Sequence, residues 1–166
     1  MLQRVKLAIL DRDGVINHDS SSYIKSPDEW CPIDGSLEAI AKLNQANIKV
    51  GVATNQSGVA RGYYTLDTLL RIHQKMIKEL TKYDGHIDQL EFCPHHPDEL
   101  CECRKPKPGM LIKICADMHV SYSAAVMIGD SKRDMVAAES IGINGIWIGK
   151  DYPNLLEAVN ALLSKQ

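Results

Sequence analysis

Short apolar runs alternate with helical patterns along the chain. Five runs predict strands, because each is apolar and followed by polar or turn-forming residues; they span residues 7–10, 50–53, 90–92, 125–128 and 145–148. Between them, spacings of three and four between apolar residues predict helices over residues 37–45, 66–80, 110–118, 132–140 and 155–163. This alternation favours the α/β class, in which a doubly wound, Rossmann-like parallel sheet carries helices on both faces.

The helix predicted over residues 66–80 has the clearest pattern. Its apolar face is expected to consist of Leu66, Leu69, Leu70, His73, Met76, Ile77 and Leu80. A histidine on such a face is more often packed or capped than bound to a ligand. We therefore expect His73 to belong to the core.

Length and charge narrow the class of protein. The chain has 166 residues, and we expect a single domain that spans residues 1–166. A hydrophobic content of 45% is enough for a core, and a formal net charge of −2 favours neither nucleic acid nor a membrane as partner. Because the sequence shows no apolar run of about 18 residues and no basic leader, we expect a cytoplasmic protein.

Polar side chains follow three of the predicted strands. Asp11 and Asp13 come after the first strand, Thr54 and Asn55 after the second, and Asp130 after the fourth. In parallel sheets these strand ends converge on one crevice. The three carboxylates would repel one another without a cation, and hard oxygen ligands favour Mg²⁺. The sequence therefore predicts an acidic crevice that holds magnesium.

Two further segments suit a phosphate group. The hydroxyl of Thr54 and the backbone N–H groups that follow it can bind phosphate oxygens. In CRKPKPGM, residues 103–110, Pro106 and Pro108 stiffen the loop and keep it non-helical as far as Gly109. Lys105 would then present a fixed ammonium group to a phosphoryl group. Asp134 lies four residues after Asp130, so both are expected on one face of a helix, with Asp134 orienting Lys105.

A cluster of cysteines predicts a second metal site. Cys93, His95, Cys101 and Cys103 form a C-x-H pair and a C-x-C pair. Three thiolates and one imidazole complete a closed tetrahedral Zn²⁺ site of the structural kind. His96 fits this spacing less well than His95. Cys31 and Cys115 are assigned no role.

The segments LDRDGVIN, ATNQSGVARG, CRKPKPGM and MIGDSKRDM, in this order, resemble those of the haloacid dehalogenase-like phosphatases, and the match runs from residue 11 to about residue 149. FCPHHPDELCEC resembles the zinc loop of one branch of that family. The resemblance implies a haloacid dehalogenase-like fold with a zinc loop at residues 93–103 and no large cap domain. It also implies a nucleophile, Asp11, and an acid/base, Asp13. Mg²⁺ would be held by Asp11, the carbonyl of Asp13 and Asp130, phosphoryl oxygens by Thr54 and Lys105, and Asp134 would support this side of the site.

The resemblance also implies a small sugar phosphate as substrate. The motifs look most like those of branch members that remove the 7-phosphate from D-glycero-D-manno-heptose 1,7-bisphosphate, in nucleotide-heptose biosynthesis for surface polysaccharide. The short spacing between His95 and Cys101 resembles members that act on histidinol phosphate, so that activity is the alternative. A zinc-stabilised binding module without catalysis is a third reading. We expect a monomer, and residues expected to contact the substrate are Asp19, Tyr23, Asn55, Gln56, Ser57, Arg104 and Lys105, with Arg61 and Lys107 as further cations for a second phosphate.

Overall fold

Five parallel strands form the central sheet of the structure, a computed structural model that describes residues 3–166. They are β1 (Leu7–Leu10), β2 (Lys49–Asn55), β3 (Gln89–Cys93), β4 (Ala125–Gly129) and β5 (Asn144–Trp147). Their order is β3-β2-β1-β4-β5, so the direction of winding reverses between β1 and β4. Open α/β sheets bind ligands at such a switch point.

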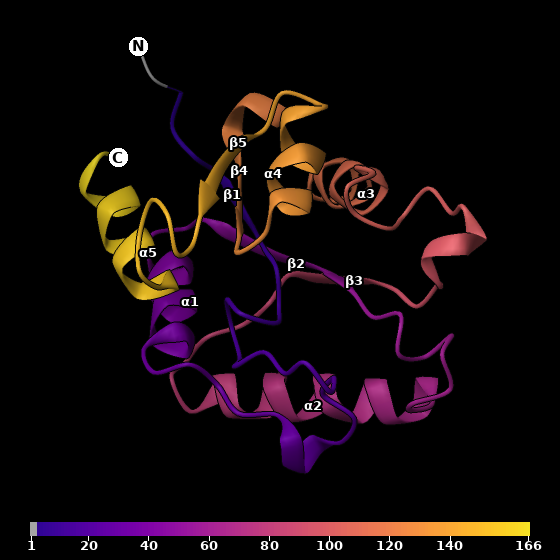
Figure 1. Cartoon of the computed structure of the whole chain (residues 1–166). Helices are drawn as coiled ribbons and strands as arrows, with labels where there is room; N and C mark the ends of the chain where they lie inside the picture. The colour runs from indigo at the N-terminus through magenta and orange to yellow at the C-terminus, as the bar shows by residue number, and fades with distance from the viewer. Residues whose placement is uncertain (1–2) are drawn as a thin grey trace.

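Helices cover both faces of this sheet (Figure 1). One face packs against α1 (Ser36–Gln45), α2 (Leu66–Thr81) and α5 (Leu155–Ser164), and the other against α3 (Gly109–Met118) and α4 (Lys132–Glu139). Because side chains alternate along a strand, Ala8 and Leu10 enter the first core cluster while Leu7 and Ile9 enter the second. The predicted doubly wound architecture is confirmed.

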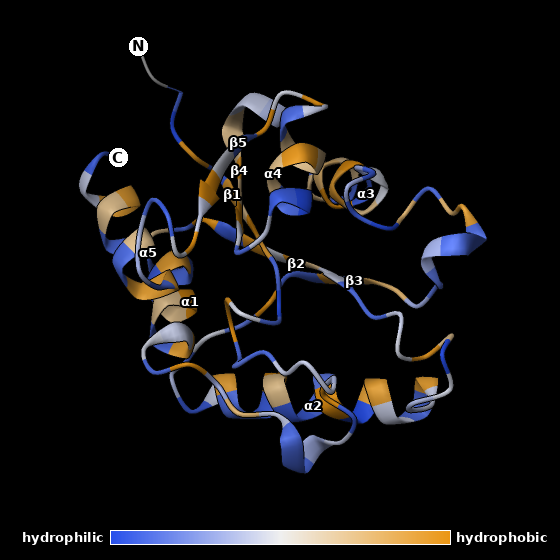
Figure 2. Ribbon diagram, in the orientation of Figure 1, coloured by the Kyte–Doolittle hydropathy of each residue, from blue (hydrophilic) through white to orange (hydrophobic). Residues whose placement is uncertain are grey.

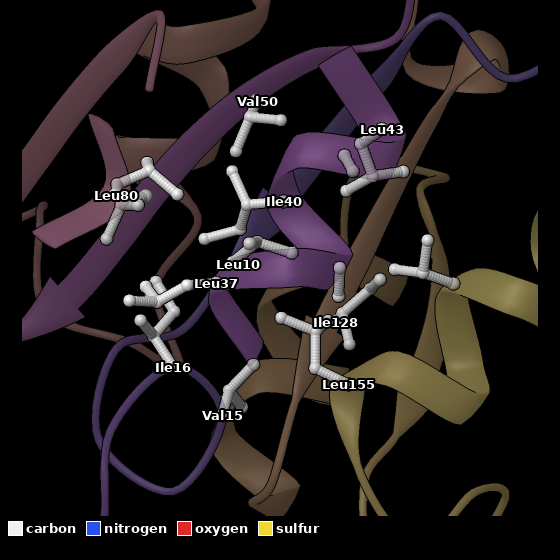
Figure 3. Close-up of a cluster of buried hydrophobic side chains, with 14 of the residues drawn as sticks. Leu10, Val15, Ile16, Leu37, Ile40, Leu43, Val50, Leu80, Ile128 and Leu155 are labelled. Carbon is white, nitrogen blue, oxygen red and sulfur yellow. The ribbon is translucent and has the colours of Figure 1, made fainter. Parts of the chain in front are cut away.

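The larger core cluster joins three strands to α1 and α5. Figure 3 shows Leu10, Val50 and Ile128 of the sheet beside Ile40 of α1 and Leu155 of α5. All of these side chains are fully buried. Burial of each contributes about 1.5–3 kcal/mol, so this cluster fixes the strands whose ends carry the polar residues.

The predicted element boundaries are confirmed to within two residues. The largest difference is in β2, which extends to Asn55, so that Thr54 and Asn55 end the strand instead of following it. The proline-rich segment behaves as expected, since α3 begins at Gly109. No helix in residues 3–166 is both long and apolar enough to cross a membrane.

The apolar face predicted for α2 is wrong on one flank. Leu66, Leu70 and Ile77 are 47%, 44% and 45% exposed, whereas Ile72, which the prediction omitted, is fully buried. The buried face is turned because α2 also packs against the short helix at residues 27–29, where Lys75 donates to the carbonyls of Pro27 and Trp30. Figure 2 shows hydrophobic and hydrophilic residues alternating along α2.

Candidate active site

A polar cavity of about 230 Å³ opens beyond the carboxyl ends of the strands at the switch point. Most of the residues predicted for the crevice line it. Thr54 and Asp134, which are buried behind the wall, do not. The residues that line the cavity are Asp11, Asp13, Asp19, Ser20, Tyr23, Ile24, Asn55, Gln56, Ser57, Arg61, Arg104, Lys105, Asp130 and Arg133.

Three carboxylates meet at the base of the cavity, two of them in its lining and Asp134 buried behind them. Oxygen atoms of Asp11, Asp130 and Asp134 lie within 4.8 Å of one another. Gly14 permits this approach, since a Cβ at this position, where φ is 82°, would collide with the Asp130 carboxylate. Burial, and to a smaller extent the neighbouring carboxylates, raise the pKa of Asp11 to about 8 against the opposing effect of Lys105. Crowded oxygen ligands of this kind fit a hard divalent cation.

Lys105 is the buried cation that balances these acids. Only 1% exposed, it donates from Nζ to Asp11 Oδ1 at 3.0 Å, to Asp134 Oδ1 at 2.6 Å and to the carbonyl of Ala53 at 2.7 Å. Although burial lowers the pKa of Lys105, the two carboxylates raise it above its ordinary value. All three N–H bonds of the ammonium group are therefore used, and its position is fixed.

The backbone of Lys105 is fixed as well. Asn55 donates from Nδ2 to the Lys105 carbonyl at 3.0 Å and accepts the Lys105 N–H on Oδ1 at 3.0 Å. Asn55 lines the cavity, but both ends of its amide are engaged by this loop. The hydrogen bonds of the Asn55 side chain therefore hold the backbone of Lys105 in place.

Asp134 lies in the first turn of α4 and faces the lysine. Its Oδ2 accepts from the backbone N–H and the hydroxyl of Ser131, at 3.1 and 2.8 Å, in a capping box. The expectation that Asp130 and Asp134 share a helical face is wrong, because Asp130 precedes the helix, which starts at Lys132. The two acids still meet, because Asp134 is in the first turn of α4, which begins directly after the end of β4 and Asp130.

Asp13 is held by donors on both of its oxygens. Arg12 Nε and Asn17 Nδ2 donate to Oδ1, each at 2.9 Å, and Gln56 Nε2 donates to Oδ2 at 3.2 Å. Gln56 also donates to Thr54 Oγ1 at 2.8 Å and accepts from the Tyr64 hydroxyl at 2.6 Å. The hydroxyl of Thr54 is thus linked to Asp13 through Gln56.

Arg12 and Tyr64 were not predicted for this site. Arg12 is fully buried, and its Nη1 lies 3.1 Å from His73 Nε2. Burial, with a further contribution from Arg12, lowers the pKa of His73 to about 3. As predicted, His73 is a core residue, only 4% exposed. Nothing in the sequence distinguishes Arg12 from a solvated arginine, and nothing marks Tyr64.

Three arginines line the rim of the cavity. None of Arg61, Arg104 and Arg133 forms an ion pair with any residue from 3 to 166. Arg61 and Arg104 were expected here, whereas Arg133 was not. Lys107 was expected to face the substrate but is absent from the cavity lining, because it pairs with Glu102 on the outer side of the loop at 3.0 Å.

The predicted thiol cluster assembles between β3 and α3. Cys93 Sγ lies 3.4 Å from His95 Nδ1 and 3.5 Å from Cys101 Sγ, and His95 Nδ1 lies 3.2 Å from Cys103 Sγ. A Zn²⁺ tetrahedron with its usual bond lengths has edges of about 3.5–3.8 Å, so the donors fit a zinc ion after a small expansion. His96 instead caps the short helix at residues 97–99 by accepting from Asp98 N–H.

Comparison with known proteins identifies the family. The haloacid dehalogenase-like hydrolases match residues 3–142. The chain belongs to this family. As predicted from its motifs, this haloacid dehalogenase-like hydrolase carries the aspartates at the ends of β1 and β4.

Several phosphatases are similar to this haloacid dehalogenase-like hydrolase. The D-glycero-beta-D-manno-heptose-1,7-bisphosphate 7-phosphatase of Pseudomonas putida is 49% identical over 144 residues, covering 87% of this chain and 82% of the relative. The enzyme of the same name from Pseudomonas aeruginosa is 51% identical over 135 residues, covering 81% and 76%. A crystal structure of D,D-heptose 1,7-bisphosphate phosphatase from B. bronchiseptica, complexed with magnesium and phosphate, has a TM-score of 0.93 and 40% identity, covering 98% of this chain and 100% of that chain.

Proposed function

We propose that this chain is a Mg²⁺-dependent phosphatase that removes the 7-phosphate from D-glycero-β-D-manno-heptose 1,7-bisphosphate. The observation that carries the proposal is the placement of Asp11, at the switch point, against the buried ammonium group of Lys105, with Asp13 and Asp130 on the same cavity. Relatives that are 49% and 51% identical to this chain are named for that activity.

The first step forms an aspartyl-phosphate. A carboxylate oxygen of Asp11 attacks phosphorus while the bond from phosphorus to the sugar oxygen breaks. Asp13 gives its proton to that oxygen, so the sugar leaves as an alcohol. Lys105, already fixed beside Asp11, offsets negative charge on the transferring group.

The second step releases phosphate. Asp13, now ionised, takes a proton from a water molecule, whose oxygen attacks phosphorus. The bond from phosphorus to Asp11 breaks, which restores the carboxylate of Asp11 and the proton of Asp13. Mg²⁺ would be held by Asp11, Asp130 and the carbonyl of Asp13, and it supplies positive charge for the phosphoryl oxygens.

One comparison of substrates tests this proposal. We expect kcat/KM with Mg²⁺ to be at least about 100-fold higher for heptose 1,7-bisphosphate than for histidinol phosphate. The reverse preference would favour histidinol phosphate, to which the short zinc-loop spacing points. A protein inactive on both esters, with intact fold and metal content, would support a binding module.

Mg²⁺ should raise the melting temperature of the protein, and by more at about pH 8.5 than at about pH 6.5. Burial raises the pKa of Asp11 to about 8, so at the lower pH the cation must displace a proton from this group. Scanning fluorimetry at both pH values measures the effect. Asp130→Asn should remove most of the shift, whereas Asp67→Asn, on the exposed side of α2, should keep it. Equal shifts at the two pH values would contradict binding by Asp11.

One tightly bound Zn²⁺ per chain is expected, separate from the exchangeable Mg²⁺. The three thiols and His95 form a soft ligand set, in contrast to the carboxylates of the cavity. Elemental analysis of the purified protein decides the point. Cys103→Ser should lower the zinc content, and Cys115→Ser, at a buried thiol outside the cluster, should not. Zinc-free protein with reduced, intact ligands would rule the site out.

Arg104→Ala should lower kcat/KM for the heptose bisphosphate by about 10- to 100-fold, the loss expected for one charge-assisted contact of about 1.5–3 kcal/mol. Arg104 lines the cavity beside Lys105, and its buried Nη1 has no hydrogen-bond partner among residues 3–166. The loss of kcat/KM should be much smaller for p-nitrophenyl phosphate, which has no sugar or second phosphate for Arg104 to contact.

Lys107→Ala is the matched control for Arg104. It removes a cation from the same loop, but its side chain pairs with Glu102 outside the cavity. We expect this variant to hydrolyse both esters normally. Equal losses on both esters in Arg104→Ala would show that Arg104 supports the loop and does not contact the sugar.

A further inference from the structure

We infer that Arg12 is a positioning residue for the acid/base carboxylate: it fixes Asp13 Oδ1 in the interior, so that Oδ2 alone faces the cavity and exchanges the proton. This inference rests on the proposed function, because it assigns the oxygen through which Asp13 acts. Arg12 itself is fully buried and does not line the cavity.

The first argument is the burial of a charged side chain. A guanidinium group is costly to remove from water unless its surroundings pair with it. In residues 3–166 its one ionic partner is Asp13, with Nε 2.9 Å and Nη2 2.8 Å from Oδ1. A planar guanidinium fixes the direction of a carboxylate more firmly than a flexible ammonium group does.

The second argument is the group behind the guanidinium. Nη1 of Arg12 lies 3.1 Å from His73 Nε2. Arginine has only donors, so Nε2 must accept, which requires a neutral imidazole. His73 comes from α2 and is itself buried, so the core of the protein fixes the far side of Arg12.

The third argument is the unequal use of the two Asp13 oxygens. Oδ1 accepts from both Arg12 Nε and Asn17 Nδ2 at 2.9 Å, which fills its lone pairs. Among residues 3–166, Oδ2 accepts only the longer contact of 3.2 Å from Gln56, whose orientation the Tyr64 hydroxyl fixes. The proton of Asp13 therefore belongs on Oδ2, which is the oxygen left for the substrate.

If Arg12 positions Asp13, the loss of rate caused by replacing Arg12 should depend on the leaving group of the ester. A sugar alkoxide needs the proton of Asp13 in the first step, whereas p-nitrophenolate leaves without one. Hydrolysis of the aspartyl-phosphate needs Asp13 as base for either ester. A misplaced Asp13 should thus slow both steps for the sugar, but only the second step for p-nitrophenyl phosphate.

The test uses Arg12→Met in the whole 166-residue chain. We expect kcat/KM for heptose 1,7-bisphosphate to fall by about 10- to 100-fold and kcat/KM for p-nitrophenyl phosphate to change by less than about 3-fold. With the second ester, kcat and KM should fall together, and rapid mixing should show a burst of p-nitrophenolate. Lys49→Met, which removes an exposed cation far from the cavity, should behave like the unmodified protein.

Two further variants keep the test decisive. If Arg12→Met does not fold, Arg12→Lys retains the charge without the fork and should show the same pattern with smaller losses. When Arg12→Met is added to Asp13→Asn, kcat/KM for heptose 1,7-bisphosphate should fall by less than about 3-fold further, because Arg12 acts through Asp13.

Equal losses of kcat/KM on both esters without a burst, or additive losses in the double variant, would overturn the inference and leave Arg12 a purely structural residue. The unmodified protein separates this outcome from failure of the proposed function. If it hydrolyses the heptose bisphosphate normally, only the inference fails; if it does not hydrolyse this ester, the proposed function fails first.

Discussion

Replacing Asp11 with asparagine should reduce turnover by about 10⁴-fold or more, because an amide cannot attack phosphorus. Asp11 is directly beyond β1, and its Oδ1 accepts from Lys105 Nζ at 3.0 Å, so one carboxylate oxygen is already fixed beside the cavity. The loss should be equally severe for the sugar ester and for p-nitrophenyl phosphate, since both need the nucleophile. Steady-state rates with excess Mg²⁺ measure it.

The same substitution should leave the fold intact or strengthen it. In the folded state the pKa of Asp11 rises from 3.8 to about 8, mainly through burial, so the folded protein binds the proton more tightly than the unfolded chain. Stability therefore falls as pH rises through this window, and asparagine removes that dependence. Urea unfolding at several pH values, without added Mg²⁺, gives the comparison. A near-normal turnover rate would remove Asp11 from the nucleophile's role.

Lys105→Met should be the most destabilising of the substitutions considered, by about 3–5 kcal/mol. The change leaves the buried carboxylates of Asp11 and Asp134 without their shared cation, and it leaves the Ala53 carbonyl without a donor. Activity should fall by about 10²–10³-fold on any phosphate ester, because a fixed positive charge is lost beside the reacting group. Urea unfolding and kcat together measure the two effects.

A second substitution provides the internal check on Lys105. Adding Asp11→Asn to Lys105→Met removes one of the two unpaired carboxylates, so it should restore part of the lost stability. Lys49→Met serves as control, because that ammonium group is exposed and its one hydrogen bond within the described part of the chain is to the carbonyl of Met118. A stable Lys105→Met variant, or additive losses in the double variant, would contradict the pairing seen in the structure.

The sequence predicted the strands and helices well because their patterns are local. A run such as LAIL followed by aspartates describes a buried strand and its end without reference to the rest of the chain. The meeting of Asp11 with Asp130 then follows from the rule that parallel strands end at one edge. The thiol cluster was predictable for a similar reason, since its ligands lie within one short segment.

The contacts that were missed join residues far apart in the chain. The far side of the buried Arg12 guanidinium contacts His73, which is 61 positions away in the chain. Asn55 supports Lys105, which is 50 positions away in the chain. The sequence does not show this contact, and a polar residue at a strand end suggested a contact with substrate instead. The turned face of α2 likewise depends on the loop that packs against it. Such pairings depend on how elements pack, and no local pattern contains that information.

The two hydrogen bonds between the Asn55 side chain and the Lys105 backbone also have a thermodynamic consequence. Lys105 lies two residues after Cys103, so a metal bound by the thiols orders the same short segment that Asn55 holds and that reaches Asp11. Two ligands that order one segment have linked binding equilibria. A phosphate ion in the cavity should therefore tighten the binding of metal by the thiols, and loss of that metal should weaken phosphate binding by the same free energy.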